Sequence, residues 1–202
     1  MQINNLDPDH FKKFKALLFD CDGTLVDTMP SHYDSWKAIL TKYNIPFDYE
    51  KFYKLAGVPT KDIVRLLAEE NGKSLDASLI SHEKDTFFHQ NIEQVQPIHA
   101  VVNLARNYLG QKKMAVASGS SKWSVVELLK SVGILNWFPV ISAAEDVKRP
   151  KPYPDVFLNA AHLLNVQPSE CCVFEDAELG IQGAEAAGMT AINILKTDLI
   201  NL

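Results

Sequence analysis

Residues 17–28 read Leu-Leu-Phe-Asp-Cys-Asp-Gly-Thr-Leu-Val-Asp-Thr, an apolar run that ends in two aspartates and a glycine. A buried parallel strand has this pattern, because it is apolar along its length and delivers polar side chains at its carboxyl end. Side chains i and i+2 of a strand point to the same side, so Asp20 and Asp22 would share one site while Cys21 faces the other way. We therefore expect chemistry at the end of this strand.

The two carboxylates would repel each other at such a site. Proteins relieve this repulsion with a cation, a shared proton or hydrogen bonds. The pair favours a divalent metal, and Mg²⁺ suits hard oxygen ligands and usually takes one or two carboxylates together with phosphate oxygens. Asp-x-Asp alone is a weak signal, because a solvated acidic turn after a strand has the same pattern.

Composition limits the class of protein. At 202 residues the chain can form one domain, with or without an insertion, and its net charge of -5 gives no basic surface for nucleic acid or anionic lipid. No apolar stretch approaches the roughly 20 residues that span a membrane, and residues 1–15 lack the apolar core of a secretory signal. Cys21, Cys171 and Cys172 lie in apolar runs and predict buried thiols in a reducing compartment. We expect a monomeric cytoplasmic protein.

Residues 29–95 differ from the rest in their periodicity. Apolar residues recur at helical spacing in residues 31–43 and 59–70, and residues 75–92 form a long polar stretch that is compatible with a helix. A helical block of this length is too long for an ordinary strand-to-helix connection. We therefore predict a core of residues 1–28 and 96–202 and an inserted all-helical cap of residues 29–95, joined by proline-bearing hinges. The alternative is that these helices extend a single domain.

Strands and helices alternate after residue 97, which predicts an α/β fold with a doubly wound parallel sheet. The expected strands are 113–118, 138–142, 171–175 and 190–194, and the expected helices are 98–109, 119–132, 153–164 and 178–187.

Polar residues follow several of these strands. Ser118 and Gly119 could bind phosphate oxygens through a hydroxyl and free N–H groups, although serine is also a common helix N-cap. Lys151 lies in a proline-rich loop and could neutralise phosphate; the alternative is a solvated basic loop. Glu175 and Asp176 could hold a metal, or could simply be acidic residues at a helix N-terminus.

The order of these motifs resembles the haloacid dehalogenase superfamily of aspartate-nucleophile phosphotransferases: Asp-x-Asp-Gly-Thr, a strand-end Ser, Lys-Pro-x-Pro-Asp and a strand-end Glu-Asp. The resemblance extends from about residue 15 onward. It implies that Asp20 attacks a phosphoryl group and becomes a phosphoaspartate, and that Asp22 protonates the leaving oxygen and later activates water. Members that remove halide lack the second aspartate, so Asp22 points to phosphoryl transfer.

The same resemblance implies the ligands of the site. Phosphate would be bound by Ser118, Gly119 and Lys151, with Lys151 preferred over Lys148 because only Lys151 begins Lys-Pro-x-Pro-Asp. The Mg²⁺ ligands would be Asp20, the main-chain carbonyl of Asp22 and Asp176, with Glu175 beside them.

Within the superfamily the chain is similar to the helical-cap branch that contains β-phosphoglucomutase and small sugar phosphatases. This branch places substrate-selecting residues in the cap segment that here contains Gly57 and Thr60, and its mutases carry an arginine at the position of Thr60. The lack of that arginine favours a phosphatase of the fructose 1-phosphate or 6-phosphogluconate type, with β-phosphoglucomutase as the alternative. His32 either contacts substrate or is structural.

A phosphoaspartate receiver in signalling, which would be a switch and not an enzyme, is a different class. It also uses an acidic pair, a strand-end Ser or Thr and a lysine on a doubly wound sheet. The aspartate two residues after the nucleophile and the helical insertion both argue against it. An inactive binding protein is the other non-enzymatic alternative, yet no motif residue is missing.

Overall fold

The structure is a computed structural model that describes residues 8–55, 58–92 and 95–197. The chain forms two compact units, one built from both ends of the chain, up to Asp27 and from Gln96, and the other from Thr28–Val95. None of the helices within the described ranges has the length and apolar character needed to cross a membrane. The roles of the two units as catalytic core and cap stay predictions.

The first unit is organised around a sheet of five parallel strands. In spatial order they are β5 (Val140–Ser142), β4 (Lys113–Ala117), β1 (Ala16–Phe19), β6 (Cys171–Glu175) and β7 (Thr190–Asn193). Leu18 of the central strand is in register with Ala115 on one side and Val173 on the other. Since the strand order reverses at β1, the carboxyl end of β1 is the switch point at which α/β sheets bind ligands.

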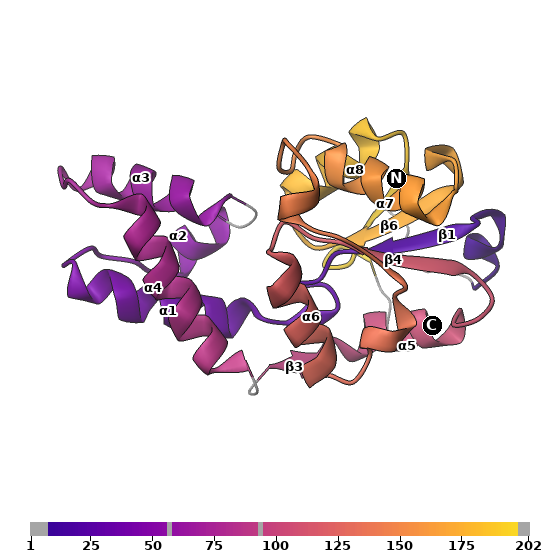
Figure 1. Cartoon of the computed structure of the whole chain (residues 1–202), viewed down its shortest axis with the longest axis horizontal. Helices are drawn as coiled ribbons and strands as arrows, with labels where there is room; N and C mark the ends of the chain where they lie inside the picture. Colours follow the sequence, from indigo (N-terminus) through magenta and orange to yellow (C-terminus); the bar gives the residue numbers. More distant parts are fainter. Residues whose placement is uncertain (1–7, 56–57, 93–94, 198–202) are drawn as a thin grey trace. The chain divides into compact units, whose positions relative to one another are not determined.

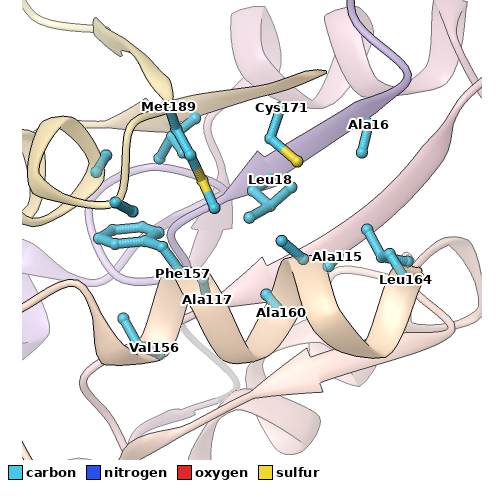
Figure 2. Packing of buried hydrophobic residues seen from close by; sticks show 14 residues of the cluster. Ala16, Leu18, Ala115, Ala117, Val156, Phe157, Ala160, Leu164, Cys171 and Met189 are labelled. Atoms are coloured by element: carbon cyan, nitrogen blue, oxygen red, sulfur yellow. The ribbon is translucent and has the colours of Figure 1, made fainter. Parts of the chain in front are cut away.

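Helices cover both faces of this sheet, with α7 and α8 on one side and α5 and α6 on the other (Figure 1). Their bounds are α5 (His99–Asn107), α6 (Lys122–Ser131), α7 (Asp155–Leu164) and α8 (Glu178–Ala186). Figure 2 shows the packing of one face, where Phe157 and Ala160 of α7 lie against Leu18 and Ala115. Because both faces are buried, β1 is apolar along its whole length and β6 is apolar up to Glu175 at its carboxyl end, as the sequence indicated.

Short elements complete this unit. They are η1 (Pro8–Lys13), β2 (Val26–Asp27), β3 (Gln96–Pro97), η3 (Leu135–Trp137), η4 (Ala144–Asp146) and η5 (Pro168–Glu170). The strands β2 and β3 pair antiparallel, so the segments directly before residue 28 and directly after residue 95 lie side by side. Two-residue strands have no detectable periodicity, so the sequence did not indicate this pairing. All three cysteines are buried, as predicted, and burial raises the pKa of each thiol.

The second unit is all-helical and has a hydrophobic core of its own. Its helices are α1 (Met29–Lys42), α2 (Tyr49–Lys54), α3 (Thr60–Glu70) and α4 (Ala77–Gln90). Trp36, Leu40 and Leu67 are among the residues buried in its core. The sequence did not predict α2, because six residues are too few to show a period; the Asp48 side chain caps it by accepting a hydrogen bond from the Lys51 amide. The predicted α/β fold with a helical insertion after the first strand is confirmed.

Candidate active site

A buried lysine joins two carboxylates at the carboxyl edge of the sheet. Asp20 directly follows β1, and Glu175 is the last residue of β6. The Lys151 Nζ donates to Asp20 Oδ1 at 2.7 Å and to Glu175 Oε1 at 2.5 Å. All three side chains are removed from water, with exposed fractions of 6% for Asp20, 8% for Lys151 and 1% for Glu175. The alternative that Lys151 belongs to a solvated basic loop is therefore wrong.

The loop that carries Lys151 is closed by a second ion pair. The Arg149 guanidinium donates through Nε to Asp155 Oδ1 at 3.0 Å and through Nη2 to Asp155 Oδ2 at 2.7 Å. The same guanidinium lies over the Tyr153 ring, 4.7 Å from its centroid. Lys148, the neighbouring lysine, is exposed. The sequence did not indicate this role of Arg149, because a charged pair six residues apart in a loop has no recognisable pattern.

Asp176 joins this cluster from the segment after β6. Its Oδ1 accepts a hydrogen bond of 2.9 Å from the buried Thr24 hydroxyl, so the threonine of the Asp-x-Asp-Gly-Thr motif orients a carboxylate far along the chain. Gly23 has φ +78°, and a Cβ at this position would lie 2.5 Å from Asp176 Oδ2. Both the turn and the close approach therefore require glycine. Sequence reasoning missed the role of Thr24, although the residue is part of the quoted motif.

Glu175 is held from two sides. Its Oε1 accepts from Lys151, and its Oε2 accepts from the main-chain N–H of Ala177 at 2.8 Å. Helix α8 passes so close that a Cβ at Gly180 would lie only 1.8 Å from Glu175 Oε1. Glu175 is a buried residue at the end of β6 that accepts both from Lys151 and from the N–H of Ala177, the N-cap residue of α8, so it belongs to the cluster as well as to the helix N-terminus.

The acidic residues of this cluster suit a divalent cation. Asp20, Glu175 and Asp176 each offer a carboxylate oxygen, and these oxygens all lie within 4.8 Å of one another. Three carboxylates and the single ammonium of Lys151 leave two negative charges in excess if all are ionised. Because carboxylate oxygens are hard ligands, the donor set fits Mg²⁺. The carboxylate of Asp22 is not part of this group, and the use of its main-chain carbonyl as a ligand stays a prediction.

The shifted pKa values of the carboxyl groups in this cluster also indicate that it lacks positive charge. Burial raises the pKa of Asp20 well above its usual range, and the charges of Glu175 and Asp176 add to this, whereas Lys151 counteracts it. Burial and then the Glu175 charge raise the pKa of Asp176 to about 6. Burial by itself would lower the pKa of Lys151, but the carboxylates of Asp20 and Glu175 outweigh it and raise that pKa. A cation at this place would favour the ionised carboxylates.

The serine-rich loop after β4 lies beside Asp22. The buried Ser118 hydroxyl accepts from the Ser120 N–H at 3.0 Å, and Gly119 is exposed. The Ser120 hydroxyl donates to Asp22 Oδ2 at 2.7 Å. Ser121, and not Ser118, is the N-cap of α6, because its hydroxyl accepts from the Ser124 N–H at 3.2 Å. The capping-only interpretation of Ser118 is therefore wrong, and the helix begins three residues later than expected.

The predicted substrate residues of the cap belong to the helical unit. His32 lies in α1, where its ring stacks on Phe88 with centroids 4.0 Å apart and its Nδ1 is 2.9 Å from the Nζ of the buried Lys84. Thr60 is the first residue of α3. Gly57 lies outside the described residues. A role in substrate contact stays a prediction for all three.

Comparison with known proteins places the chain in a family. The model of haloacid dehalogenase-like hydrolases matches residues 17–194. The chain is 36% identical to the fructose-1-phosphate phosphatase YqaB of Escherichia coli strain K12 over 185 residues, which are 91% of this chain and 98% of that protein. It is 29% identical to the beta-phosphoglucomutase of Bacillus subtilis over 187 residues, with 89% of this chain and 83% of the mutase covered.

A solved structure agrees with this placement. The crystal structure of β-phosphoglucomutase from Clostridium difficile matches with a TM-score of 0.80 and 26% identity, and the match covers 91% of this chain and 88% of the other. The family model spans the whole motif set, from the first strand to the last. The chain is therefore a member of the haloacid dehalogenase-like hydrolase family.

Proposed function

We propose that this hydrolase is a Mg²⁺-dependent phosphatase that acts on a small sugar phosphate, of the fructose 1-phosphate or 6-phosphogluconate type, through a phosphoaspartate at Asp20. One observation carries the proposal: Asp20 Oδ1 lies 2.7 Å from the buried ammonium of Lys151, within a cluster of carboxylates at the sheet edge. A carboxylate can approach a negatively charged phosphoryl group only where positive charge is arranged around both.

Different residues of the chain would bind the phosphoryl group and the metal ion. The Lys151 ammonium, the Ser118 hydroxyl and the Gly119 N–H would bind the equatorial phosphoryl oxygens, on which the transition-state charge is spread. Asp20, Asp176 and the main-chain carbonyl of Asp22 would hold Mg²⁺ with Glu175 beside them, and the ion, when bound, supplies the positive charge that the cluster lacks.

The reaction has two balanced steps. First, a carboxylate oxygen of Asp20 attacks phosphorus, the bond between phosphorus and the sugar oxygen breaks, and Asp22 gives its proton to that oxygen. Then a water molecule attacks the phosphorus and gives a proton to Asp22, the bond from phosphorus to Asp20 breaks, and phosphate leaves. Asp22 is thereby returned to its protonated state, as a general acid and base must be.

The substrate class rests on the relatives and on the cap. The Escherichia coli relative, which this chain matches over 98% of its length, is a fructose-1-phosphate phosphatase. Beta-phosphoglucomutase is the second candidate, because one sequence relative and one matching solved structure carry that name. Thr60 favours the phosphatase, since the resemblance to this branch implies an arginine at that position in the mutases. In this proposal residues 1–28 and 96–202 are the catalytic core, and residues 29–95 are the cap that selects the substrate.

Phosphate release from a panel of sugar phosphates, with Mg²⁺ and with excess chelator, tests the proposal. The panel includes fructose 1-phosphate, 6-phosphogluconate, and β-glucose 1-phosphate with a trace of its bisphosphate. We expect Mg²⁺-dependent phosphate release from one of the first two. Formation of glucose 6-phosphate with little free phosphate would instead identify a mutase.

A further inference from the structure

Three serines of the loop between β4 and α6 have three different partners. The Ser118 hydroxyl accepts a hydrogen bond from a main-chain N–H of the same loop, and the Ser121 hydroxyl caps α6. Only the Ser120 hydroxyl reaches across to the first motif, where it donates to Asp22 Oδ2 at 2.7 Å. The distance is that of a strong hydrogen bond between a hydroxyl and a carboxylate.

Ser120 is held at its main chain on both sides. Its N–H donates to the Ser118 Oγ at 3.0 Å, and its carbonyl accepts from the Ala144 N–H at 3.0 Å. The main chain around Asp22 is fixed as well, because the Gly23 N–H donates to the Val26 carbonyl at 2.8 Å and closes the turn. The hydroxyl of Ser120 and the carboxyl of Asp22 therefore meet between two anchored loops.

We propose that Ser120 is a positioning residue, whose hydroxyl fixes the direction of the Asp22 carboxyl so that it can pass its proton to the leaving oxygen. The inference rests on the proposed function. When Asp22 gives up its proton it becomes negatively charged, and the hydrogen bond from Ser120 becomes charge-assisted and stronger. The interaction therefore grows toward the transition state, which is the condition under which a contact raises the rate.

Two phosphate esters that differ in their need for the acid test the inference. A sugar phosphate has an alkoxide leaving group that must be protonated, whereas p-nitrophenyl phosphate has a good leaving group that needs little help. The parameter to measure is kcat/KM, because it reports the steps up to formation of the phosphoenzyme. We expect Ser120→Ala to lower kcat/KM for the sugar phosphate about 10- to 100-fold and for p-nitrophenyl phosphate less than about 3-fold.

Two further variants separate positioning from folding. Ser120→Thr keeps the hydroxyl and should recover kcat/KM for the sugar phosphate to within about 5-fold of wild type. Ser121→Ala is the matched control, since it removes the neighbouring serine hydroxyl and with it the helix cap. It should lower the Tm while leaving the ratio of the two kcat/KM values unchanged.

The outcomes distinguish the two proposals. A loss of equal size on both esters, a failure of Ser120→Thr to recover activity, or a gain of sugar phosphatase activity in Ser120→Ala would each overturn the inference alone. The gain would mean that the hydrogen bond holds Asp22 away from the reacting atoms. Wild-type protein that releases phosphate from neither ester with Mg²⁺ would overturn the proposed function and the inference with it.

Discussion

Replacement of Lys151 by methionine tests whether the charge of this lysine stabilises the two buried carboxylates beside it. Methionine keeps the length and most of the volume of the lysine side chain but has no charge, so the change removes the ammonium that bridges Asp20 and Glu175. Both carboxylates stay buried, and neither retains the cation that the wild-type protein provides. The substitution therefore isolates the charge from the packing.

We expect the Lys151→Met substitution to lower the free energy of unfolding strongly at neutral pH and less at acidic pH. Removing one partner of a buried ion pair costs about 3–5 kcal/mol, which for a chain of this size is a fall in Tm of about 10 °C. Burial already raises the pKa of Asp20 and Lys151 opposes that rise, so the variant raises it further. A carboxyl whose pKa is raised in the folded state loses its stabilising contribution as the pH rises through that pKa. The destabilisation should therefore be greater at about pH 8 than at about pH 5.

Calorimetry of the metal-free protein at these two pH values measures this difference. Lys148→Met is the matched control, because it removes the same charge from an exposed side chain of the same loop. It should change the free energy of unfolding by less than about 0.5 kcal/mol. A Lys151→Met protein with the wild-type Tm at neutral pH would show that the Lys151 charge does not stabilise the buried carboxylates. An equal loss of unfolding free energy at both pH values would also contradict this role.

The remaining predictions concern the carboxylates. The pKa of Asp176 is raised from 3.8 to about 6 in the folded protein. The free energy of unfolding of the metal-free protein should therefore fall by up to about 3 kcal/mol as the pH rises between these two pKa values. Added Mg²⁺ should accordingly raise the Tm more at about pH 7 than at about pH 4, and an equal shift would contradict this. Gly180→Ala drives a Cβ into Glu175 and should cost about 1–3 kcal/mol in a denaturant melt, more than Gly183→Ala, whose Cβ would be 3.1 Å from its nearest neighbour. Asp22→Asn should keep the wild-type Tm and Mg²⁺ affinity in calorimetry while phosphate release falls about 100-fold or more, and a variant that stays active would count against the acid/base role.

The sequence predicted the elements that bring the acidic cluster together. The strand ends at Asp20 and Glu175 are marked by apolar runs followed by acids, and parallel strands place their carboxyl ends at one edge. Lys151 was found through its motif. The strand predictions succeeded because each rests on a local pattern combined with one topological rule, whereas the role of Lys151 stays a prediction.

The sequence could not predict which side chains contact one another. Ser118, Ser120 and Ser121 are chemically identical, and only their hydrogen bonds distinguish the N-cap from the residue that contacts Asp22. The requirement for glycine at position 180 likewise follows from the approach of α8 to Glu175, which no local pattern expresses. Elements of two to six residues, such as α2 and the β2–β3 pair, are too short to show a period.

The proposed function depends above all on Asp20 as the nucleophile. Phosphate release by Asp20→Asn protein is the most direct test of this role. Wild type and variant are compared on the sugar phosphate that wild type hydrolyses best with Mg²⁺, after circular dichroism and a cooperative thermal transition show that both are folded at the assay temperature. We expect steady phosphate release by wild type and none by the variant, because an amide cannot form the acyl phosphate. Release by Asp20→Asn at the wild-type rate would contradict the account.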